Sequence, residues 1–401
     1  MLHILYLAHD LADPAVRRRV LTLQAGGARV SLAGFRRGQN TLATINGIVP
    51  IELGTTADGR FAQRLGAVGK ACLTLRNNLR GIDRPDVIVA RNLEMLAVAN
   101  RAIALFGGDI PLAYECLDIH RLMLRGDFAG KAMRWAEAAL GKRSSVLITS
   151  SPAFIDNYFR PLSGLKMPTV LLENQVLELD DCDAPVGVFP RPPVAGAPWK
   201  IGWFGALRCR KSLALLADFS RRMEGRFEIV LRGRPAQSEF SDFEGFVRSE
   251  PFMNFRGAYR NPEDLAAIYN DVHFSWAIDF FEEGQNSSWL LPNRLYEGCR
   301  HGALPIVIRG TETERFVTGK GIGFVLEAAS SPDLVSLIGD MDRDRYLAAF
   351  DRLASHADGT WVFDRADCRA LVQRLSTLAG SSRLKPLRAA PQTQSNERGL
   401  S

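Results

Sequence analysis

A stretch between residues 279 and 308 carries the side chains with the clearest chemical potential. Its entry is a polar loop with three hydrogen-bonding side chains, Asn286, Ser287 and Ser288. Pro292 then marks the start of a helix, because a residue without an N–H group loses nothing in the first turn. Gly302 suits the left-handed end of the same helix. The unpaired N–H groups at such a helix start attract anions, and a diphosphate is an anion that they can hold.

Two side chains of this helix extend the pattern toward a nucleotide. Glu297 follows Asn293 by about one helical turn, so both lie on one face of the helix. A carboxylate there repels phosphate but accepts two hydrogen bonds from the diol of a ribose. The spacing therefore predicts a site for a nucleotide diphosphate, although an ordinary solvated helix with a strong start signal explains the spacing equally well.

A second loop, residues 205–212, offers positive charge. Gly205 lets the backbone turn tightly, and Arg208 and Lys211 provide cations where a diphosphate leaving group needs its charge neutralised. Arg210 is an alternative to either cation. Taken alone, a basic turn of this kind is more often a solvated face.

Candidate acids and bases follow the strands of the first half of the chain. A strand expected at residues 112–115 is followed by Asp118 and His120, and either Asp118 or Glu115 is a candidate general base. His120 is a candidate base or a group that orients the acceptor. Glu283, in the polar loop, is the third candidate catalytic residue. A helix cap is the simpler explanation of an acid that follows a strand.

The basic start of the chain has a plainer interpretation. His9 and Asp10 follow the first expected strand, where ligands of α/β proteins gather, and three consecutive arginines, residues 17–19, follow on a helix. A capped turn and a solvated basic helix face explain this pattern.

The elements that must position these residues repeat one architecture. The first half alternates apolar runs with helical patterns, and strands are expected at residues 3–8, 30–35, 87–90, 112–115, 146–149 and 169–172. The second half does the same, with strands at residues 200–204, 227–231, 272–278 and 303–308. The pattern predicts an α/β protein with two Rossmann-like domains that face a cleft.

Length, charge and cysteine content agree with this organisation. A chain of 401 residues suits two domains, and it contains no apolar run long enough to span a bilayer. The first residues form a strand and not a signal peptide. A net charge of +6 without a nucleic-acid-binding motif favours phosphate ligands and an anionic membrane surface over nucleic acid. The six cysteines form no CxxC pair, so we expect no metal site and a reducing cytoplasm.

The segment PNRLYEGCRHGALPIVI, residues 292–308, resembles the donor-binding segment of GT-B glycosyltransferases, in particular glycosyltransferase family four enzymes of bacterial exopolysaccharide biosynthesis. The resemblance implies a GT-B fold in which Glu297 binds the ribose, while the polar loop 286–288 lies near the diphosphate or the sugar. The loop at 205–212 is similar to the family's basic diphosphate loop. The same resemblance implies that the backbone at Gly257 lies near the donor base. Many members carry a further Glu where this chain has Trp289.

The resemblance also divides the chain. It implies an acceptor-binding domain (1–180), a linker (181–198) with five prolines, a nucleotide-sugar-binding domain (199–360) and a helix that crosses back (361–380). Residues 381–401 are expected to be disordered. Since basic groups and a helix start neutralise the diphosphate, neither metal nor cofactor is expected.

The function that these expectations imply is transfer of a sugar from a UDP-sugar to a saccharide acceptor linked to polyprenol diphosphate. The enzyme would be cytoplasmic and peripheral on the inner membrane, with a basic helix at residues 60–84 near the lipid. Two alternatives remain open: a UDP-sugar epimerase of the same architecture, and a non-catalytic nucleotide-sugar-binding partner in a polysaccharide assembly complex.

Overall fold

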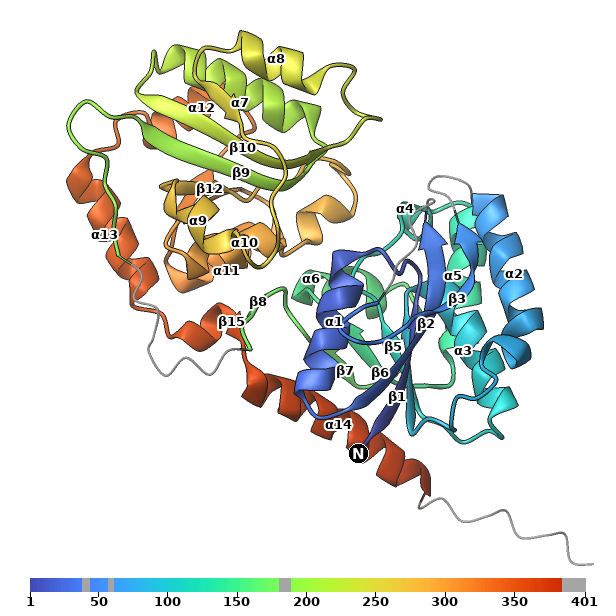
Figure 1. Ribbon diagram of the computed structural model, residues 1–401. Helices are drawn as coiled ribbons and strands as arrows, with labels where there is room; N and C mark the ends of the chain where they lie inside the picture. The colour runs from blue at the N-terminus through green and yellow to red at the C-terminus, as the bar shows by residue number, and fades with distance from the viewer. Residues whose placement is uncertain (38–43, 57–60, 180–188, 384–401) are drawn as a thin grey trace, which may run out of the picture.

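The chain forms two parallel sheets, each covered by helices, that lie one above the other (Figure 1). The computed structural model describes residues 1–37, 44–56, 61–179 and 189–383. The N-terminal sheet has the strand order β3-β2-β1-β4-β5-β6-β7, and the C-terminal sheet has the order β11-β10-β9-β12-β13-β14. Both are doubly wound orders with a switch point beside the first strand, where ligands of open α/β sheets bind.

The N-terminal domain contains the first seven strands. These are β1 (His3–Ala8), β2 (Arg29–Arg37), β3 (Ile51–Thr56), β4 (Val87–Arg91), β5 (Leu112–Glu115), β6 (Ser144–Thr149) and β7 (Thr169–Leu171). Its helical elements are α1 (Pro14–Ala25), α2 (Phe61–Asn78), α3 (Leu93–Leu105), α4 (Arg121–Leu124), α5 (Phe128–Gly141), α6 (Pro152–Phe154) and the π-helical turn η1 (Ile155–Phe159).

The C-terminal domain repeats this plan. Its strands are β9 (Trp199–Leu207), β10 (Phe227–Pro235), β11 (Met253–Phe255), β12 (Phe274–Trp276), β13 (Leu304–Ile308) and β14 (Phe324–Leu326). Its helical elements are α7 (Arg210–Arg222), α8 (Phe243–Ser249), α9 (Leu265–Asn270), η2 (Asn286–Trp289), α10 (Asn293–Arg300), α11 (Glu312–Lys320), α12 (Ser331–Ile338), α13 (Arg343–Ala354) and η3 (Asp358–Thr360). The connections between the halves contain β8 (Val176–Leu177), β15 (Val362–Phe363) and α14 (Arg365–Arg383).

Burial explains why these segments become strands and helices. The six residues of β1 are all buried, as expected for a central parallel strand that is covered on both faces. One face of the N-terminal sheet packs on α2, α3 and the segment α6–η1, and the other packs on α1 and α14. The apolar runs without charged residues in the sequence therefore correspond to strands that are buried on both faces of the sheet.

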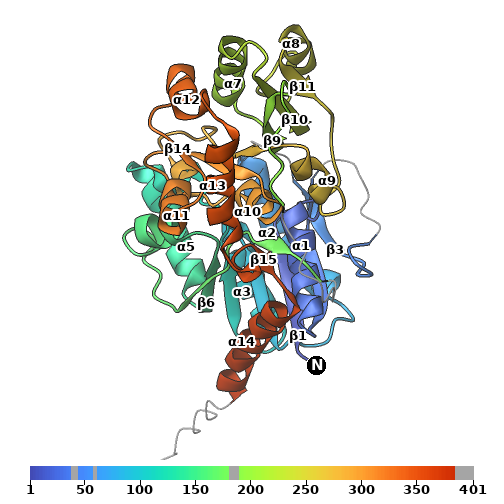
Figure 2. The same cartoon turned by 90° about the vertical axis from the view of Figure 1, so that its left-hand side faces the viewer.

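The last helix, α14, completes the N-terminal domain (Figure 2). Leu371, Val372 and Leu375 are buried in the same apolar cluster as Val16 and Val20 of α1. The two helices approach closely at Gly26, where an added Cβ would lie 2.3 Å from the Cys368 carbonyl oxygen. A glycine at this position is therefore required by packing and not by its backbone angle.

Several element ends differ from the sequence expectation. The last helix begins at Arg365 and not at Trp361, because Val362 and Phe363 pair as β15 with β8. It continues to Arg383, so the first residues of the expected disordered tail are helical. The strand expected at 272–278 is limited to β12, and the basic helix expected at 60–84 is α2. Residues 189–198 of the expected linker contain no helix or strand, while 180–188 and 384–401 lie outside the described residues.

A buried acid lies in the core of the N-terminal domain. Glu137 of α5 is 0% exposed and accepts hydrogen bonds from the hydroxyl groups of Tyr114 (2.7 Å) and Tyr158 (2.6 Å). Burial raises the pKa of Glu137 to about 7, and the two phenol donors only partly offset that effect. The side chain is therefore mostly neutral under acidic conditions and resists ionisation as the pH rises.

We predict that Glu137 makes the N-terminal domain less stable at alkaline pH. The raised pKa in the folded state means that stability is full below the ordinary carboxyl pKa and falls until the pH passes about 7. The total loss is roughly 3 kcal/mol. Urea unfolding should show that the free energy of unfolding of the wild-type protein, relative to that of Glu137→Gln, falls by most of this amount between pH 5 and pH 8. Parallel pH profiles of the two proteins would contradict the assignment.

Candidate functional site

A short segment of the C-terminal domain, residues 286–291, docks on the N-terminal domain. The Asn286 side chain is 2% exposed, and its Nδ2 donates to Asp118 Oδ1 (2.8 Å) and to the Ile119 carbonyl oxygen (2.7 Å). Ser151 Oγ donates to the Trp289 carbonyl oxygen (2.5 Å), and the Trp289 ring packs against the N-terminal core. The two domains therefore meet at the carboxyl end of β5 and in the segment that follows β12.

This contact explains the tryptophan at position 289. The resemblance to family four enzymes associates that position with a glutamate, but here the side chain and its neighbour Leu290 pack against apolar residues of the other domain. A carboxylate in that place could not make these apolar contacts. The residue at this position serves domain docking in this chain.

Glu297 lies on α10 and faces inward. It is 6% exposed, and its carboxylate accepts hydrogen bonds from Asn261 Nδ2 (2.8 Å) and from the Tyr269 hydroxyl (3.1 Å). Burial raises its pKa, while these two donors and the cations of Arg18 and Arg294 lower it. The acid is thus held as an acceptor of two hydrogen bonds from uncharged donors of its own domain.

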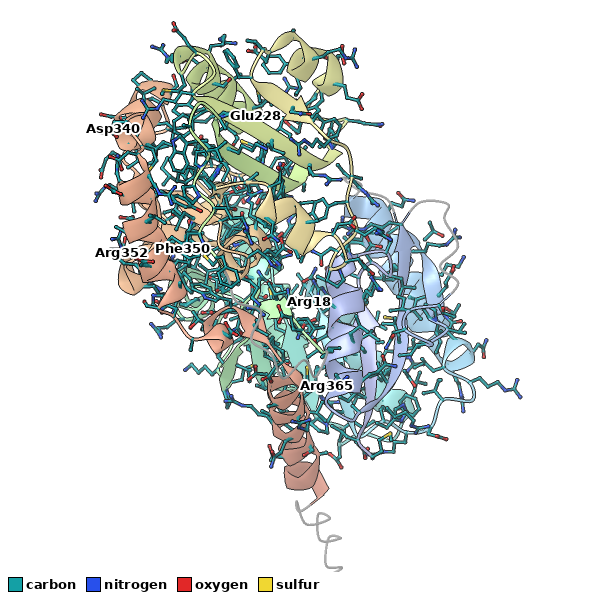
Figure 3. The ribbon with its side chains drawn as sticks, turned by 60° about the vertical axis from the view of Figure 1, so that its left-hand side comes forward. Arg18, Glu228, Asp340, Phe350, Arg352 and Arg365 are labelled. Atoms are coloured by element: carbon teal, nitrogen blue, oxygen red, sulfur yellow. The ribbon has the colours of Figure 1, made fainter. Side chains whose placement is uncertain are left out.

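The positive charge of Arg18 acts on this acid from the other domain. It lies on α1 near the boundary between the domains (Figure 3), and its guanidinium donates to the Gln175 carbonyl oxygen. Burial and the charge of Arg19 lower the pKa of Arg18 to about 10, against the opposing charge of Glu297. The sequence pattern predicted a solvated basic face for residues 17–19, and this is wrong for Arg18, which is half-buried, and for Arg19, which is buried.

Arg19 belongs to a buried network that excludes Glu115 as a general base. Glu115 is 0% exposed and accepts from Arg19 Nε (2.5 Å), the Tyr6 hydroxyl (2.7 Å) and Arg91 Nη1 (3.3 Å). Burial alone would raise the pKa of Glu115, but the two arginines and Tyr6 outweigh it and lower the pKa. A paired and inaccessible carboxylate of this kind holds the strand ends in place.

Arg208 follows β9 and faces the domain junction. Its Nη2 lies 3.4 Å from Asp279 Oδ2, its guanidinium stacks over the Phe281 ring at 4.5 Å, and its Nε is buried without a hydrogen-bond partner. The side chain is 41% exposed, so the guanidinium remains accessible. The same positive charge acts on Asp118 of the other domain.

Lys211 opens α7 and is paired with a residue that the sequence suggested for catalysis. Its Nζ lies 2.6 Å and 2.9 Å from the two carboxylate oxygens of Glu283 and over the ring of Phe280. Both side chains of the pair are about half exposed. An exposed ion pair is worth little, so an incoming polyanion can replace Glu283 at Lys211.

Two carboxylates from opposite domains influence one another at this junction. Burial raises the pKa of Glu282, and the negative charge of Asp118 raises it further. Desolvation also raises the pKa of Asp118, while Arg208 opposes this effect. Perturbed acids at a domain junction are typical of acid–base sites. Sequence reasoning chose Glu283, which stays a prediction, and the pKa of its neighbour Glu282 adds a second acid near the junction.

His120 has a local structural role. It is the N-cap of α4, and its Nδ1 accepts a hydrogen bond from the Leu122 N–H (3.3 Å). Partial burial and the nearby Arg64 lower its pKa. An imidazole that remains neutral and accepts a backbone hydrogen bond is held in one orientation beside Asp118.

The remaining predicted residues surround these side chains. Gly205 has φ +105° and pairs in register with Gly233, whose added Cβ would lie 1.8 Å from the Gly205 carbonyl oxygen, so the adjacent strand ends need both glycines. Gly257 has φ +72°, and its carbonyl oxygen accepts from the Gly233 N–H (2.9 Å). The other three differ in exposure: Ser287 is buried and accepts from the Glu282 N–H, Ser288 is half-buried, and Asn293 is exposed at the start of α10.

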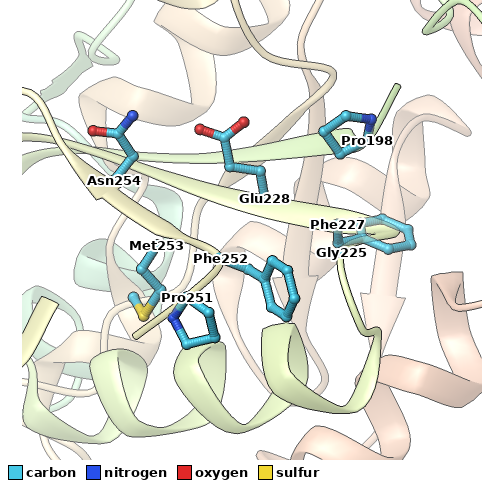
Figure 4. A pocket seen from close by; sticks show the side chains of 8 residues that line it. All are labelled: Pro198, Gly225, Phe227, Glu228, Pro251, Phe252, Met253 and Asn254. Atoms are coloured by element: carbon cyan, nitrogen blue, oxygen red, sulfur yellow. The ribbon is translucent and has the colours of Figure 1, made fainter. Parts of the chain in front are cut away.

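Other parts of the molecule are poorer candidates for a site. A pocket lined by Gly225, Glu228, Phe252 and Asn254 lies where β9, β10 and β11 begin (Figure 4), at the edge opposite the carboxyl ends that bind ligands in α/β sheets. Asp340 lies on the outer side of the C-terminal domain (Figure 3) and pairs with Arg345. Among the described residues, no cluster of three or more His, Cys, Asp or Glu is placed to hold a metal ion.

Comparison with known proteins gives one close relative. No protein-family model matches the chain. The succinoglycan biosynthesis protein ExoL of Rhizobium meliloti (strain 1021) is 67% identical over 379 residues, which cover 94% of both chains.

Solved structures share the fold at low identity. Anabaena Alr3699/HepE in complex with UDP has a TM-score of 0.66 at 14% identity, covering 94% of this chain and 100% of that one. Sucrose-phosphate synthase (tll1590) from Thermosynechococcus elongatus has a TM-score of 0.64 at 14% identity, with 95% and 97% coverage. The lipopolysaccharide outer core galactosyltransferase WaaB has 0.56 at 14% identity, with 95% and 98% coverage. These likenesses confirm the GT-B fold that the sequence predicted.

We predict that Asn286→Ala loosens the docking of the two domains. The substitution removes the hydrogen bonds that Asn286 donates to Asp118 and to the Ile119 carbonyl oxygen, which should cost about 2 kcal/mol. Small-angle scattering should show a larger radius of gyration, and the melting temperature should fall. Ser288→Ala is the matched control, because that hydroxyl donates only within its own loop. A radius of gyration equal to wild type would contradict the docking role.

Proposed function

The chain belongs to the family of the succinoglycan biosynthesis protein ExoL, and on that premise we propose that it is a GT-B glycosyltransferase. It transfers a sugar from a nucleotide-diphosphate sugar to a saccharide intermediate of an exopolysaccharide. UDP-sugar is the proposed donor, because the structurally similar HepE has been solved with UDP and with UDP-glucose.

The observation that carries this proposal is that Glu297 and the cations of the loop 205–212, Arg208 and Lys211, lie on the same domain. Glu297 is buried with its carboxylate held by two donors that a ribose diol can replace. Arg208 and Lys211 begin the neighbouring α7 region with accessible cationic groups, and both contact the segment 279–283 that leads into the docking loop. Ribose and diphosphate therefore have complementary groups on one domain.

The transfer step uses the charges at the junction. A departing diphosphate develops negative charge, which Arg208, Lys211 and the N-terminus of α10 stabilise. Asp118 lies across the junction and accepts the proton of the attacking hydroxyl, a role that its raised pKa favours. Closure of the domains through Asn286 and Trp289 keeps water from the donor. We assign His120 to orienting this acid and the acceptor.

The acceptor that we propose is a saccharide linked to polyprenol diphosphate, bound by the N-terminal domain. Such an acceptor would bring the enzyme to the inner face of the plasma membrane. None of the helices that the structure describes between residues 1 and 383 is both long and apolar enough to cross a bilayer. The proposal therefore requires a peripheral mode of attachment.

Donor and acceptor dependence test the activity itself. Purified protein is incubated with UDP-, GDP- and dTDP-sugars in turn, with and without a lipid-linked saccharide, and nucleotide release is measured. We expect release of UDP that depends on the acceptor. Conversion of the free UDP-sugar to its epimer, or binding without release, would support the alternatives of an epimerase or a non-catalytic binding partner.

We predict that Glu297→Gln weakens UDP binding about 10- to 100-fold, which corresponds to the loss of hydrogen bonds to a charged group. The neutral amide fits the same space but accepts the ribose hydroxyls poorly. Calorimetric titration with UDP gives the affinity, and turnover is measured separately. Glu263→Gln, at an exposed position of the same domain, is the control. Unchanged affinity and turnover would remove Glu297 from the site.

We predict that Arg208→Ala and Lys211→Ala each weaken binding of UDP about tenfold but leave the affinity for uridine unchanged. The difference arises because uridine lacks the diphosphate that these cations contact. Arg210→Ala is the control, since Arg210 is 69% exposed and turned toward Glu239 at 3.9 Å. An equal loss for uridine and UDP would place the cations elsewhere than at the diphosphate.

A further inference from the structure

The helix that carries Glu297 ends in a buried arginine. Arg300, the last residue of α10, is 5% exposed. Its Nε and Nη2 donate to the two carboxylate oxygens of Glu178, at 2.7 Å and 2.9 Å. Its Nη1 donates to Asp358 Oδ1 at 3.4 Å. One guanidinium therefore uses its three nitrogen atoms to bind two acids that lie far apart in the sequence.

These two acids belong to the two segments of chain that cross between the domains. We call residues 172–178 the outgoing connection and residues 355–364 the return connection. The first contains β8 and the second contains β15, and both lie between the domains (Figure 1). The two strands pair in parallel, and Gln175 Nε2 donates to the Gly359 carbonyl oxygen at 2.8 Å. The connections therefore form one unit, and Arg300 contacts both parts of it.

The outgoing connection also contacts the beginning and the middle of α10. Asn174 Nδ2 donates to the carbonyl oxygen of Leu291, just before the helix, at 2.8 Å. The hydroxyl group of the buried Tyr296 donates to Glu173 Oε2 at 2.9 Å. Together with the contact of Arg300 at the end of the helix, these bonds hold α10 to one short stretch of chain along its whole length.

The opposite side of α10 packs tightly on the C-terminal sheet. Residue 298 lies two positions from residues 296 and 300, which is about half a turn around a helix. A Cβ added at Gly298 would lie 2.8 Å from the Ser275 side chain of β12, so the helix cannot move closer to the strand. Because the sheet holds one side and the connections hold the other, the position of Glu297 between them depends on both.

The position of Arg300 at the end of a helix explains its charge but not its contacts. A helix C-terminus attracts any cation. A buried ion pair stabilises a fold little more than apolar residues of the same size, because both charges lose their hydration. The planar guanidinium that binds both oxygens of Glu178 contributes something else, since it fixes the distance and the angle between the helix and the outgoing connection.

We propose that Arg300 is a positioning residue for the donor: by holding α10 against both connections, it places the Glu297 carboxylate where the two ribose hydroxyl groups reach it. Arg300 acts through the helix and not through a contact of its own with the nucleotide. This inference rests on the proposed function, because it needs Glu297 as the ligand of the ribose.

The test compares UDP with 2′-deoxy-UDP, which lacks one of the two ribose hydroxyl groups. In calorimetric titrations, wild-type protein should bind UDP about tenfold more tightly, as expected for one hydrogen bond to a charged group. Arg300→Met should lower this ratio of affinities about fivefold, since a displaced carboxylate loses most of that hydrogen bond. A purely structural role of Arg300 would weaken the binding of both nucleotides equally and leave the ratio unchanged.

A second variant and a matched control support this comparison. Methionine fits the buried volume of Arg300, and water can hydrate Glu178, whose side chain is 36% exposed, so circular dichroism should remain that of wild type. Glu178→Ala keeps the arginine and should lower the ratio in the same way, and the double variant should be no worse than either single one. Arg309→Met is the control, because Arg309 also pairs with a glutamate, Glu327, but is 57% exposed.

The outcomes separate the positioning role from the proposed function. Wild-type protein that binds neither nucleotide would overturn the proposed function. A wild-type preference for UDP that Arg300→Met retains would overturn the positioning role alone. A loss in Arg300→Met without a loss in Glu178→Ala would also overturn it, because charge at the helix end would then suffice. A wild-type ratio near one would remove the ribose role of Glu297 and the positioning role with it.

Discussion

The contact between residues 286–291 and the N-terminal domain is the constraint on which the candidate site depends. The same segment that leads from the acids after β12 into α10 is held across the junction by Asn286 and by the packing of Trp289. Any movement of one domain therefore moves the docking loop, and with it the start of the helix that carries Glu297. In the function that we propose, donor binding and closure of the molecule would be coupled through this one stretch of chain.

The charged side chains of the candidate donor site are paired with other groups of the protein. Lys211 is occupied by Glu283, Arg208 by Asp279, and Glu297 by two uncharged donors. Each of these pairings is with a nearby side chain on the same domain, so the cations are held in place without being deeply buried. In the function that we propose, a nucleotide diphosphate would exchange these partners for its own groups, and the cost of desolvating the site would be reduced because the charges are already arranged.

The fold was largely readable from the sequence because parallel strands in doubly wound sheets are nearly continuous apolar runs, as in β1 and β5. The helix α10 was readable because Pro292 and Gly302 flank it as helix rules predict, while its role in donor binding stays a prediction. The sequence pattern could not show which residues contact one another across the junction between the two domains. Arg19 is buried because Glu115 lies opposite it, and the charge of Asp118 raises the pKa of Glu282 from the other domain. These relations depend on positions far apart in the chain.

The position of α14 has a consequence for biosynthesis. The N-terminal domain is translated first, but Val16, Val20 and Gly26 of its first helical layer are covered by residues from the last helix of the chain. A nascent chain therefore lacks the part of this cover that α14 supplies until residues 365–383 have been translated, although α1 already lies on the same face. Products of premature termination would expose that apolar surface permanently, which makes them substrates for chaperones and proteases rather than partly active enzymes.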